Sequence, residues 1–390
     1  MKRSYLGLAA IGMLFFGATQ VSMAQTTQPI TTTAVPFLRI SPDARGGGMG
    51  DLGVATTPDA SSGFYNLSKT PFAKKEIGIG LTYTPWLKDL GLNDVYLLAA
   101  SGYKKLDNLQ AISGSIRYFS LGNIQFTDNS GANIGTGNPR EWGLDFGYSR
   151  KLSDKLSIGL AAKYIYSNLA GGFSNSSTTY QPGKTFAADI SLFYTGVTED
   201  AGGWNFGLAL SNLGGKIGYT NSATDKDYIP ADLGLGTTYT AVFNEDNKLM
   251  MGLDIHKLLV PAPPADLSDS AAVANYHNKG LVGSWFNSFS GPNQLKTLQA
   301  SIGAEYSYQD QFFFRAGYYY EDRGQGDRKY FSVGVGLNYN VMGLNFSYLV
   351  PSGNGTTRNP LSNTLRFGLS FNLDSNSGNS GGGDTQTTTP

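Results

Sequence analysis

Residues 331–350 constrain the fold most, because apolar side chains alternate there with small or polar ones. Every second position is apolar in two successive segments, 331–339 and 342–350. A period of two is typical of β-strands. If Asn340-Val341 is a two-residue turn, the segments pair and both apolar rows lie on one face. The opposite face is Gly, Ser and Asn, as in the wet interior of a membrane barrel.

The composition agrees with a membrane barrel. Charged residues make up 15% of the 390-residue chain, against about 25% in soluble domains. The hydrophobic content of 40% is too low for a bundle of membrane helices, and the chain contains 51 Gly, 23 Tyr, 22 Phe and no Cys. Without Cys, an exported chain depends on its hydrogen-bond ladder for stability and not on disulfides.

The first residues predict export. Lys2-Arg3 precede an apolar run from Leu6 to Ala18, and Ser22-Met23-Ala24 offers the small residues that a signal peptidase requires. The run is shorter than the ~20 residues of a spanning helix. We therefore predict a signal peptide over residues 1–24. The remaining chain has 27 basic and 29 acidic residues, a net charge of −2, which indicates no nucleic-acid binding.

Alternation predicts an all-β fold, a transmembrane antiparallel β-barrel of fourteen strands over residues 76–373. Residues 25–75 precede it as a periplasmic or plug segment, and residues 374–390 follow as a disordered periplasmic tail. The predicted strands are 76–85, 93–104, 109–119, 141–148, 156–168, 185–197, 203–213, 231–243, 248–257, 297–308, 312–321, 329–339, 342–350 and 364–373. Each is near the ~9–11 residues that cross a bilayer.

The connections predict the orientation. Short ones (105–108, 149–155, 198–202, 244–247, 309–311 and 340–341) alternate with others that are mostly longer (86–92, 120–140, 169–184, 214–230, 258–296, 322–328 and 351–363). Outer-membrane barrels have short periplasmic turns and longer external loops. Both termini are therefore expected on the periplasmic side of a bacterial outer membrane.

Charged residues of both signs fall on the predicted inward rows: Arg117, Asp145, Lys163, Asp189, Asp254, His256, Glu305, Arg315 and Arg366. A mixture of signs favours ion pairs inside the lumen over the one-sign field of a selective channel.

Residues Gly48 to Gly53 match the dinucleotide fingerprint G-x-G-x-x-G. That motif requires a preceding strand and a following helix in a βαβ unit, and neither is expected here. Tight packing of a plug or a first strand is the favoured alternative.

Candidate catalytic residues are few. His256 shares a predicted inward row with Asp254, and His277 lies in the longest loop near Asp266 and Asp269. A hydrolase pair can be drawn from these residues, but a lumen hydrogen bond and a solvated loop residue are the favoured interpretations. Two histidines without Cys predict no metal site, and no motif predicts a cofactor.

The loop 258–296 is the most informative connection, because it carries large apolar side chains on the predicted external side. Such side chains fold over the barrel mouth, dock on another protein or line a ligand entrance, and the sequence leaves all three open. The candidate partner-binding residues are Leu259, Val260, Leu281, Val282, Trp285, Phe286 and Phe289.

The segment from Ser41 through Gly50, followed by Ala55 to Asn66, carries a family resemblance. Together with fourteen strands and the apolar loop, it resembles the PorV (LptO) family. These are outer-membrane proteins of the type IX secretion system of Bacteroidetes, within the FadL-like barrel superfamily. FadL-like transporters commonly carry Asn-Pro-Ala where this chain has Asn66-Leu67-Ser68.

The resemblance implies a carrier and not an enzyme. Such a carrier would bind the C-terminal signal domain of cargo leaving the translocon barrel. It would then deliver the cargo to a surface sortase complex that attaches cargo to lipopolysaccharide. The implied partners are the translocon, the sortase complex, cargo signal domains and outer-membrane lipid, with no nucleic acid. The main alternative is a FadL-like transporter of hydrophobic small molecules. A hydrolase acting on lipid A is a third class, for which no nucleophile and base can be placed.

Overall fold

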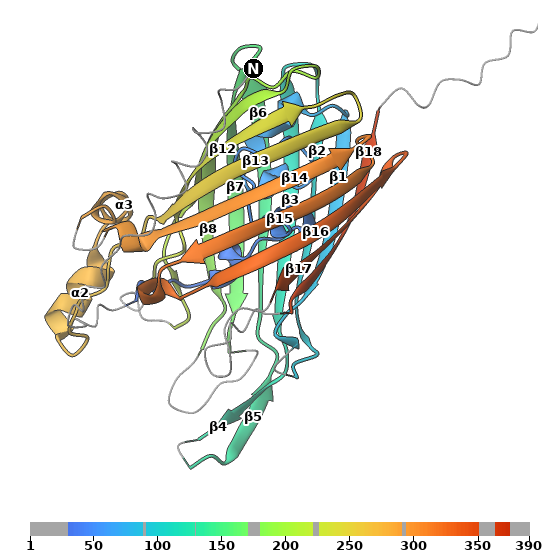
Figure 1. Cartoon of the computed structure of the whole chain (residues 1–390). Coiled ribbons are helices and arrows are strands. Elements are labelled where there is room, and N and C mark those ends of the chain that lie inside the picture. The colour runs from blue at the N-terminus through green and yellow to red at the C-terminus, as the bar shows by residue number, and fades with distance from the viewer. Residues whose placement is uncertain are drawn as a thin grey trace, which may run out of the picture.

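The computed structural model describes residues 30–88, 91–128, 130–170, 180–220, 226–290, 294–350 and 363–374. The predicted signal peptide (1–24) and all but the first residue of the predicted tail (374–390) lie outside these ranges. Within them, fourteen antiparallel strands form a closed barrel in which each barrel strand pairs with the next and β1 pairs with β18 (Figure 1). The predicted fold class and strand number are confirmed.

The barrel strands follow the predicted alternation. They are β1 (Ile77–Pro85), β2 (Val95–Lys105), β3 (Gln110–Leu121), β6 (Arg140–Lys151), β7 (Leu156–Asn168), β8 (Gly183–Thr195), β9 (Gly203–Gly214), β12 (Asp232–Val242), β13 (Asn247–Leu258), β14 (Leu298–Tyr308), β15 (Phe312–Glu321), β16 (Lys329–Tyr339), β17 (Met342–Val350) and β18 (Leu365–Leu373). Four of them, β7, β15, β16 and β17, begin and end where predicted.

The β16–β17 hairpin shows how the wall is built. Tyr339 pairs with Met342 across the turn, and Asn340 adopts a φ of 54°, a left-handed conformation that two-residue hairpins require. On β16, Phe331 and Val333 are 59% and 46% exposed, whereas Ser332 between them is 1% exposed. The apolar row therefore lies on the outside of the barrel and the polar row faces the lumen.

The short connections all lie at one end of the barrel, here called the turn end, and the long ones lie at the opposite loop end. The long connections contain elements that alternation did not predict: the hairpin β4 (Ile124–Thr127) and β5 (Asn133–Gly137), the short pair β10 (Ile217–Gly218) and β11 (Lys226–Asp227), α2 (Ser270–Asn278), α3 (Leu281–Asn287), η5 (Gln294–Thr297) and η6 (Arg323–Gln325). No helix within the described ranges is long and apolar enough to span a membrane.

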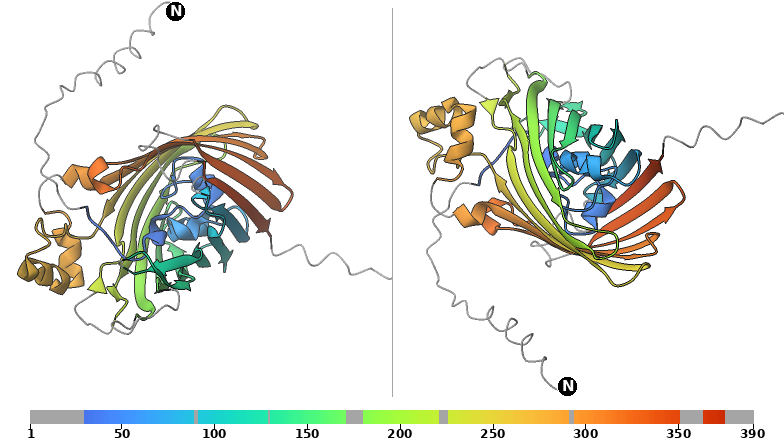
Figure 2. Two further views of the ribbon diagram at one scale, coloured as in Figure 1. Left: turned by 90° about the horizontal axis from the view of Figure 1, so that it is seen from below. Right: turned by 90° about the horizontal axis from the view of Figure 1, so that it is seen from above.

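These elements leave the barrel in different directions. Figure 1 shows β4–β5 projecting beyond the strand ends at the bottom, while α2 and α3 lie to the left, past the ends of β13 and β14. The two views in Figure 2 place α2 and α3 outside the ring of strands. The helical part of the loop 258–296 therefore does not cover the barrel mouth.

Residues 30–75, here called the plug, lie mainly inside the barrel (Figure 2). The plug contains η1 (Pro36–Arg39), α1 (Ala44–Gly47), η2 (Ser62–Phe64) and η3 (Leu67–Phe72). It begins at the loop end, where the Ala34 amide donates to the Tyr228 carbonyl over 2.9 Å. It ends at the turn end, where Lys105 Nζ donates to the Ala73 carbonyl over 3.2 Å.

This path differs from the prediction that both ends of the mature chain are periplasmic, because the plug enters the lumen from the loop end. Val35, Phe37 and Leu38 are buried there in an apolar cluster that other loop-end residues complete. The physical reason is that three successive apolar positions need an apolar partner surface, and the polar rows deeper in the lumen do not supply one.

Candidate functional site

The plug is joined to one wall of the lumen by buried ion pairs. Arg45 donates from Nε and Nη2 to the two carboxylate oxygens of Glu305 on β14, over 2.9 and 2.7 Å. Glu305 also accepts from Arg315 Nε on β15 over 2.6 Å. A bidentate contact fixes both position and orientation. The predicted lumen ion pairs are confirmed, but one of these three residues, Arg45, comes from the plug.

The local sequence explains why Arg45 reaches the wall. The Asp43 carboxylate caps α1 by accepting from the Arg45 and Gly46 amides over 3.1 and 3.0 Å, as an N-cap residue does. Arg45 is also paired with Asp59 of the plug, with Nη1 and Oδ2 2.8 Å apart. Burial acts to lower the pKa of the Arg45 guanidinium, but Glu305 and Asp59 outweigh burial and hold that pKa above its ordinary value.

Two further ion pairs join the plug to the same wall. Asp51 Oδ1 lies 2.9 Å from Arg366 Nη1 on β18, and Arg366 is 1% exposed. Nearer the loop end, Arg39 Nη2 lies 2.8 Å from Glu321 Oε1. Breaking a buried pair leaves an unpaired charge away from water, which is strongly destabilising. The wall from β14 to β18 therefore holds the plug electrostatically.

The opposite wall holds the plug mainly through neutral hydrogen bonds. The Ser101 hydroxyl donates to the Ala60 carbonyl over 2.8 Å. Asn66 Nδ2 donates to the Leu192 carbonyl over 3.0 Å, and the Thr70 and Ser149 hydroxyls are 2.8 Å apart. Each neutral bond contributes only ~0.5–1.5 kcal/mol. Arg117 adds a charged donor, with Nη1 2.8 Å from the Leu38 carbonyl.

The G-x-G-x-x-G segment is packed against the wall. Gly50 has a φ of +71°, and a Cβ there would lie 2.8 Å from the Tyr318 backbone. On the wall itself, a Cβ at Gly317 would lie 2.0 Å from the Met49 carbonyl carbon. The segment therefore needs glycine for close backbone approach. The tight-packing interpretation is confirmed, and an antiparallel barrel provides no βαβ unit for a nucleotide.

Lys69 is a second buried cation of the plug, and its hydrogen bonds go to other plug residues. Its Nζ donates to the Gly53 carbonyl over 2.7 Å and to Thr56 Oγ1 over 3.0 Å. Burial lowers the pKa of this ammonium to about 8, against the opposing attraction of Asp59. Lys69 thus connects η3 to the plug segment that contains Gly53 and Thr56.

The two histidines have different partners and lie in different parts of the molecule. His256 Nδ1 lies 2.6 Å from Asp232 Oδ2 on the neighbouring strand. Asp254 accepts instead from the Gly53 and Val54 amides of the plug over 2.7 and 2.8 Å. His277 Nδ1 lies 3.1 Å from the Lys226 carbonyl at the loop end. Among the described residues, no three His, Asp or Glu side chains are arranged to hold a metal ion.

The loop end of the lumen is filled by apolar side chains. Val35, Phe37 and Leu38 of the plug pack in a buried cluster with wall and loop residues, which are Trp86, Val95, Leu97, Phe119, Ile165, Ala187, Ile217 and Ile229. The first plug residues thus occupy the space in which an apolar ligand would enter from this side.

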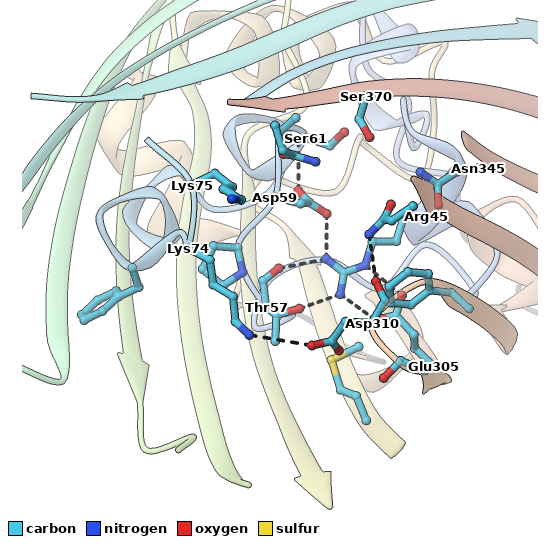
Figure 3. Close-up of a pocket in the computed structure, with 18 of the residues that line it drawn as sticks. Arg45, Thr57, Asp59, Ser61, Lys74, Lys75, Glu305, Asp310, Asn345 and Ser370 are labelled. Atoms are coloured by element: carbon cyan, nitrogen blue, oxygen red, sulfur yellow. Dashed lines mark hydrogen bonds and ion pairs between the residues drawn. The ribbon is translucent and has the colours of Figure 1, made fainter. Parts of the chain in front are cut away.

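The turn end contains a cavity of about 770 Å³. Figure 3 shows Arg45, Asp59 and Glu305 in its wall, together with Lys74 and Asp310. Lys74 Nζ lies 3.1 Å from Glu199 Oε1 and 3.9 Å from Asp310 Oδ2, at the strand turns. Apolar side chains such as Phe72 and Phe313 line the cavity beside charged groups of both signs.

The candidate partner-binding residues fall into two groups. Leu259 and Val260 are each 4% exposed, and Val260 packs in a buried cluster with Tyr228, Leu258 and Tyr276. Val282, Phe286 and Phe289 are 58%, 71% and 51% exposed on and just beyond α3. Leu281 and Trp285 are half-buried. The structure thus brings the α3 residues together and leaves Leu259 and Val260 beneath the surface.

Comparison with family models decides the identity. Residues 23–265, well over half of the chain, match the family described as type IX secretion system protein PorV. The chain belongs to this family. As a PorV-family barrel, the protein is an outer-membrane component of the type IX secretion system. The turn end is therefore periplasmic and the loop end extracellular. The match ends before α2 and α3.

Solved structures support the fold alone. The P. putida toluene transporter TodX is similar with a TM-score of 0.51 and 14% identity, over 85% of this chain and 98% of that one. The Ralstonia pickettii toluene transporter TbuX has a TM-score of 0.50 and 12% identity over the same shares. The CymD monoaromatic hydrocarbon channel has a TM-score of 0.50 and 11% identity, again over 85% and 98%. The PorV-family chain thus shares its barrel fold with these transporters and channels. A search of curated proteins finds no match.

Proposed function

We propose that this protein is a non-enzymatic carrier. It binds the C-terminal signal domain of secreted cargo as the cargo leaves the translocon barrel, and it delivers that cargo to the surface sortase complex. Membership of the PorV family supports the secretion role. The observation that carries the proposal further is the exposed apolar surface of the extracellular loop 258–296.

That surface has the composition of a protein-contact site. Val282, Phe286 and Phe289 are all more than half exposed. Exposed apolar side chains that cluster mark interaction sites more often than scattered ones do, and aromatic residues dominate the binding energy of interfaces. Leu259 and Val260 support the base of this loop from below, while Leu281 and Trp285 flank the exposed side chains.

The alternative function is transport of hydrophobic small molecules, since two similar structures are toluene transporters. The packing of the lumen argues against an apolar passage through this barrel. Its extracellular end is filled by Val35, Phe37 and Leu38, and charged side chains of both signs stand among the apolar ones that line the periplasmic cavity. An apolar solute entering from outside meets the packed plug before it reaches this cavity.

The experiment replaces Val282, Phe286 and Phe289 together with serine and measures co-purification of cargo with the tagged barrel. We expect a loss of at least tenfold, because the apolar contact area is removed while the barrel remains heat-modifiable on gels. Leu267→Ser is the matched control, since Leu267 is a 68% exposed residue of the same loop outside α3. Unchanged cargo recovery by the triple variant would contradict the proposal.

A further inference from the structure

Helix α3 turns its polar side toward the protein and its apolar side outward. Ser284 and Ser288, four residues apart, are 0% and 4% exposed. Val282 and Phe286, also four residues apart, are mostly exposed, and Phe289 continues their row. Residues with these spacings share a helix face. A helix at a water-exposed surface has the opposite arrangement.

The buried serine side is held firmly, so this orientation is built into the loop. Ser284 Oγ donates to the Tyr228 hydroxyl oxygen over 2.9 Å. The Tyr228 hydroxyl in turn donates to the Tyr276 carbonyl over 2.9 Å. Lys216 places its ammonium 4.3 Å from the centre of the Tyr228 ring and 2.8 Å from the Lys279 carbonyl. Helix α3 therefore cannot rotate its apolar row inward without breaking these contacts.

The position of α3 indicates what its apolar row contacts. Figure 2 shows α3 outside the ring of strands, and Figure 1 shows it to the left, past the ends of β13 and β14. The outer wall of the neighbouring strands exposes apolar side chains to lipid, among them Ile255 of β13 and Ile302 of β14. Lys257, two residues after Ile255 on β13, places its ammonium 5.4 Å from the centre of the Phe289 ring. The apolar row therefore begins close to the extracellular end of the lipid-facing wall.

The charge of the segment fits the same surroundings. Residues 270–298 contain Lys279, Lys296 and His277 and no Asp or Glu. Lys279 and Lys296 are both exposed, one before and one after the apolar row in the sequence. An apolar helix face flanked by cations is typical of interfacial helices that rest on anionic lipid.

We propose that, in the absence of a partner, the row Val282, Phe286 and Phe289 is inserted into the outer leaflet of the membrane. The occupant is a lipid surface: acyl chains take the apolar row, and phosphate groups lie near Lys279 and Lys296. This inference concerns the same loop as the proposed carrier function. A protein partner that binds this row must therefore displace the lipid that covers it.

Site-directed spin labelling tests the proposal on the full-length protein, which has no cysteine of its own. Single variants Phe286→Cys and Val282→Cys are spin-labelled and reconstituted at low protein density in vesicles of phosphatidylethanolamine, phosphatidylglycerol and lipid A. Collision with oxygen, which concentrates in lipid, is compared with collision with a water-soluble nickel chelate. Val333→Cys on the outer wall is the lipid control, and Ile134→Cys on β5 is the water control.

We expect the labels on α3 to favour oxygen over the nickel chelate, as Val333→Cys does and in contrast to Ile134→Cys. Labels that follow Ile134→Cys would overturn the proposal. Labels shielded from both reagents would also overturn it, because a second copy of the protein would then cover the row. The vesicles contain no translocon or cargo, so that this test can fail while the carrier function stands, and the reverse.

Discussion

The two ends of the lumen are closed by different physical means. At the extracellular end, Val35, Phe37 and Leu38 fill the space with apolar packing. At the periplasmic end, the plug stops at a cavity of about 770 Å³ whose inner wall is the Arg45–Glu305 ion pair. Apolar packing excludes water without specifying a unique partner, whereas buried ion pairs fix one geometry. The difference shows that apolar packing seals the extracellular half, while ion pairs at more than one depth, Arg45–Glu305 and Arg39–Glu321 among them, fix the position of the plug.

The largest expected effect comes from removing the ion pair that positions the plug. Arg45→Ala leaves the Glu305 and Asp59 carboxylates without their shared partner. We expect the plug to lose about 3–5 kcal/mol of its attachment to the barrel. Limited proteolysis of the plug in the folded barrel measures this change, together with ion conductance through single barrels.

Lys74→Ala is the control for this variant, because Lys74 lines the same cavity but its side chain is 70% exposed. A surface pair of this kind contributes at most about 1 kcal/mol. If Arg45→Ala and Lys74→Ala leave the plug equally protected, the ion pairs of Arg45 do not position it.

Phe37→Ala should have the next largest effect, because it opens the extracellular seal. Truncation of a buried Phe costs about 3 kcal/mol or somewhat more. We expect increased entry of small apolar dyes from outside, while the periplasmic ion pairs keep residues 45–59 resistant to protease. Dye uptake equal to that of the unaltered protein would show that the seal does not depend on this side chain.

The smallest expected effect concerns pH and Lys69. Its ammonium loses a proton near pH 8 in the docked plug, against 10.5 for an ordinary lysine. Between these values the released plug binds more protons, so rising pH favours docking. We expect protease protection of the plug to increase between pH 8 and 10 in the unaltered protein.

Lys69→Met isolates this contribution, because it keeps the length of the side chain and removes the titrating group. Protection of the unaltered protein should rise relative to that of Lys69→Met as pH rises through this range. A difference that stays constant would show that Lys69 does not titrate near pH 8.

The barrel itself could be predicted from the sequence, because a wall between lipid and a polar lumen imposes a strict period of two. Fourteen strands and the Tyr339–Met342 pairing follow from that period. The ion pairing of Glu305 with Arg315 also follows from the inward rows. The type IX secretion family was recognised from the segment 41–66 combined with the strand number.

The plug and the loop helices could not be predicted in the same way. Arg45 contacts Glu305, which lies 260 positions further along the chain, and no local pattern encodes such a distance. Helix α3 is only seven residues long and buries serine. Its sequence therefore does not show the apolar pattern that predicts a surface helix. The loop-end start of the plug was missed because Val35, Phe37 and Leu38 acquire their partners only from distant strands.

The central claim is that the protein works through partners at its extracellular surface and not by passing solutes through its lumen. A mild-detergent pull-down of the tagged protein from its native outer membrane, followed by mass spectrometry of the eluate, tests this claim most directly. The account predicts recovery of a large translocon barrel, a sortase-like protease or proteins that share a C-terminal β-domain. Recovery of the barrel alone with bound fatty acid or another apolar small molecule would contradict it and favour the transporter.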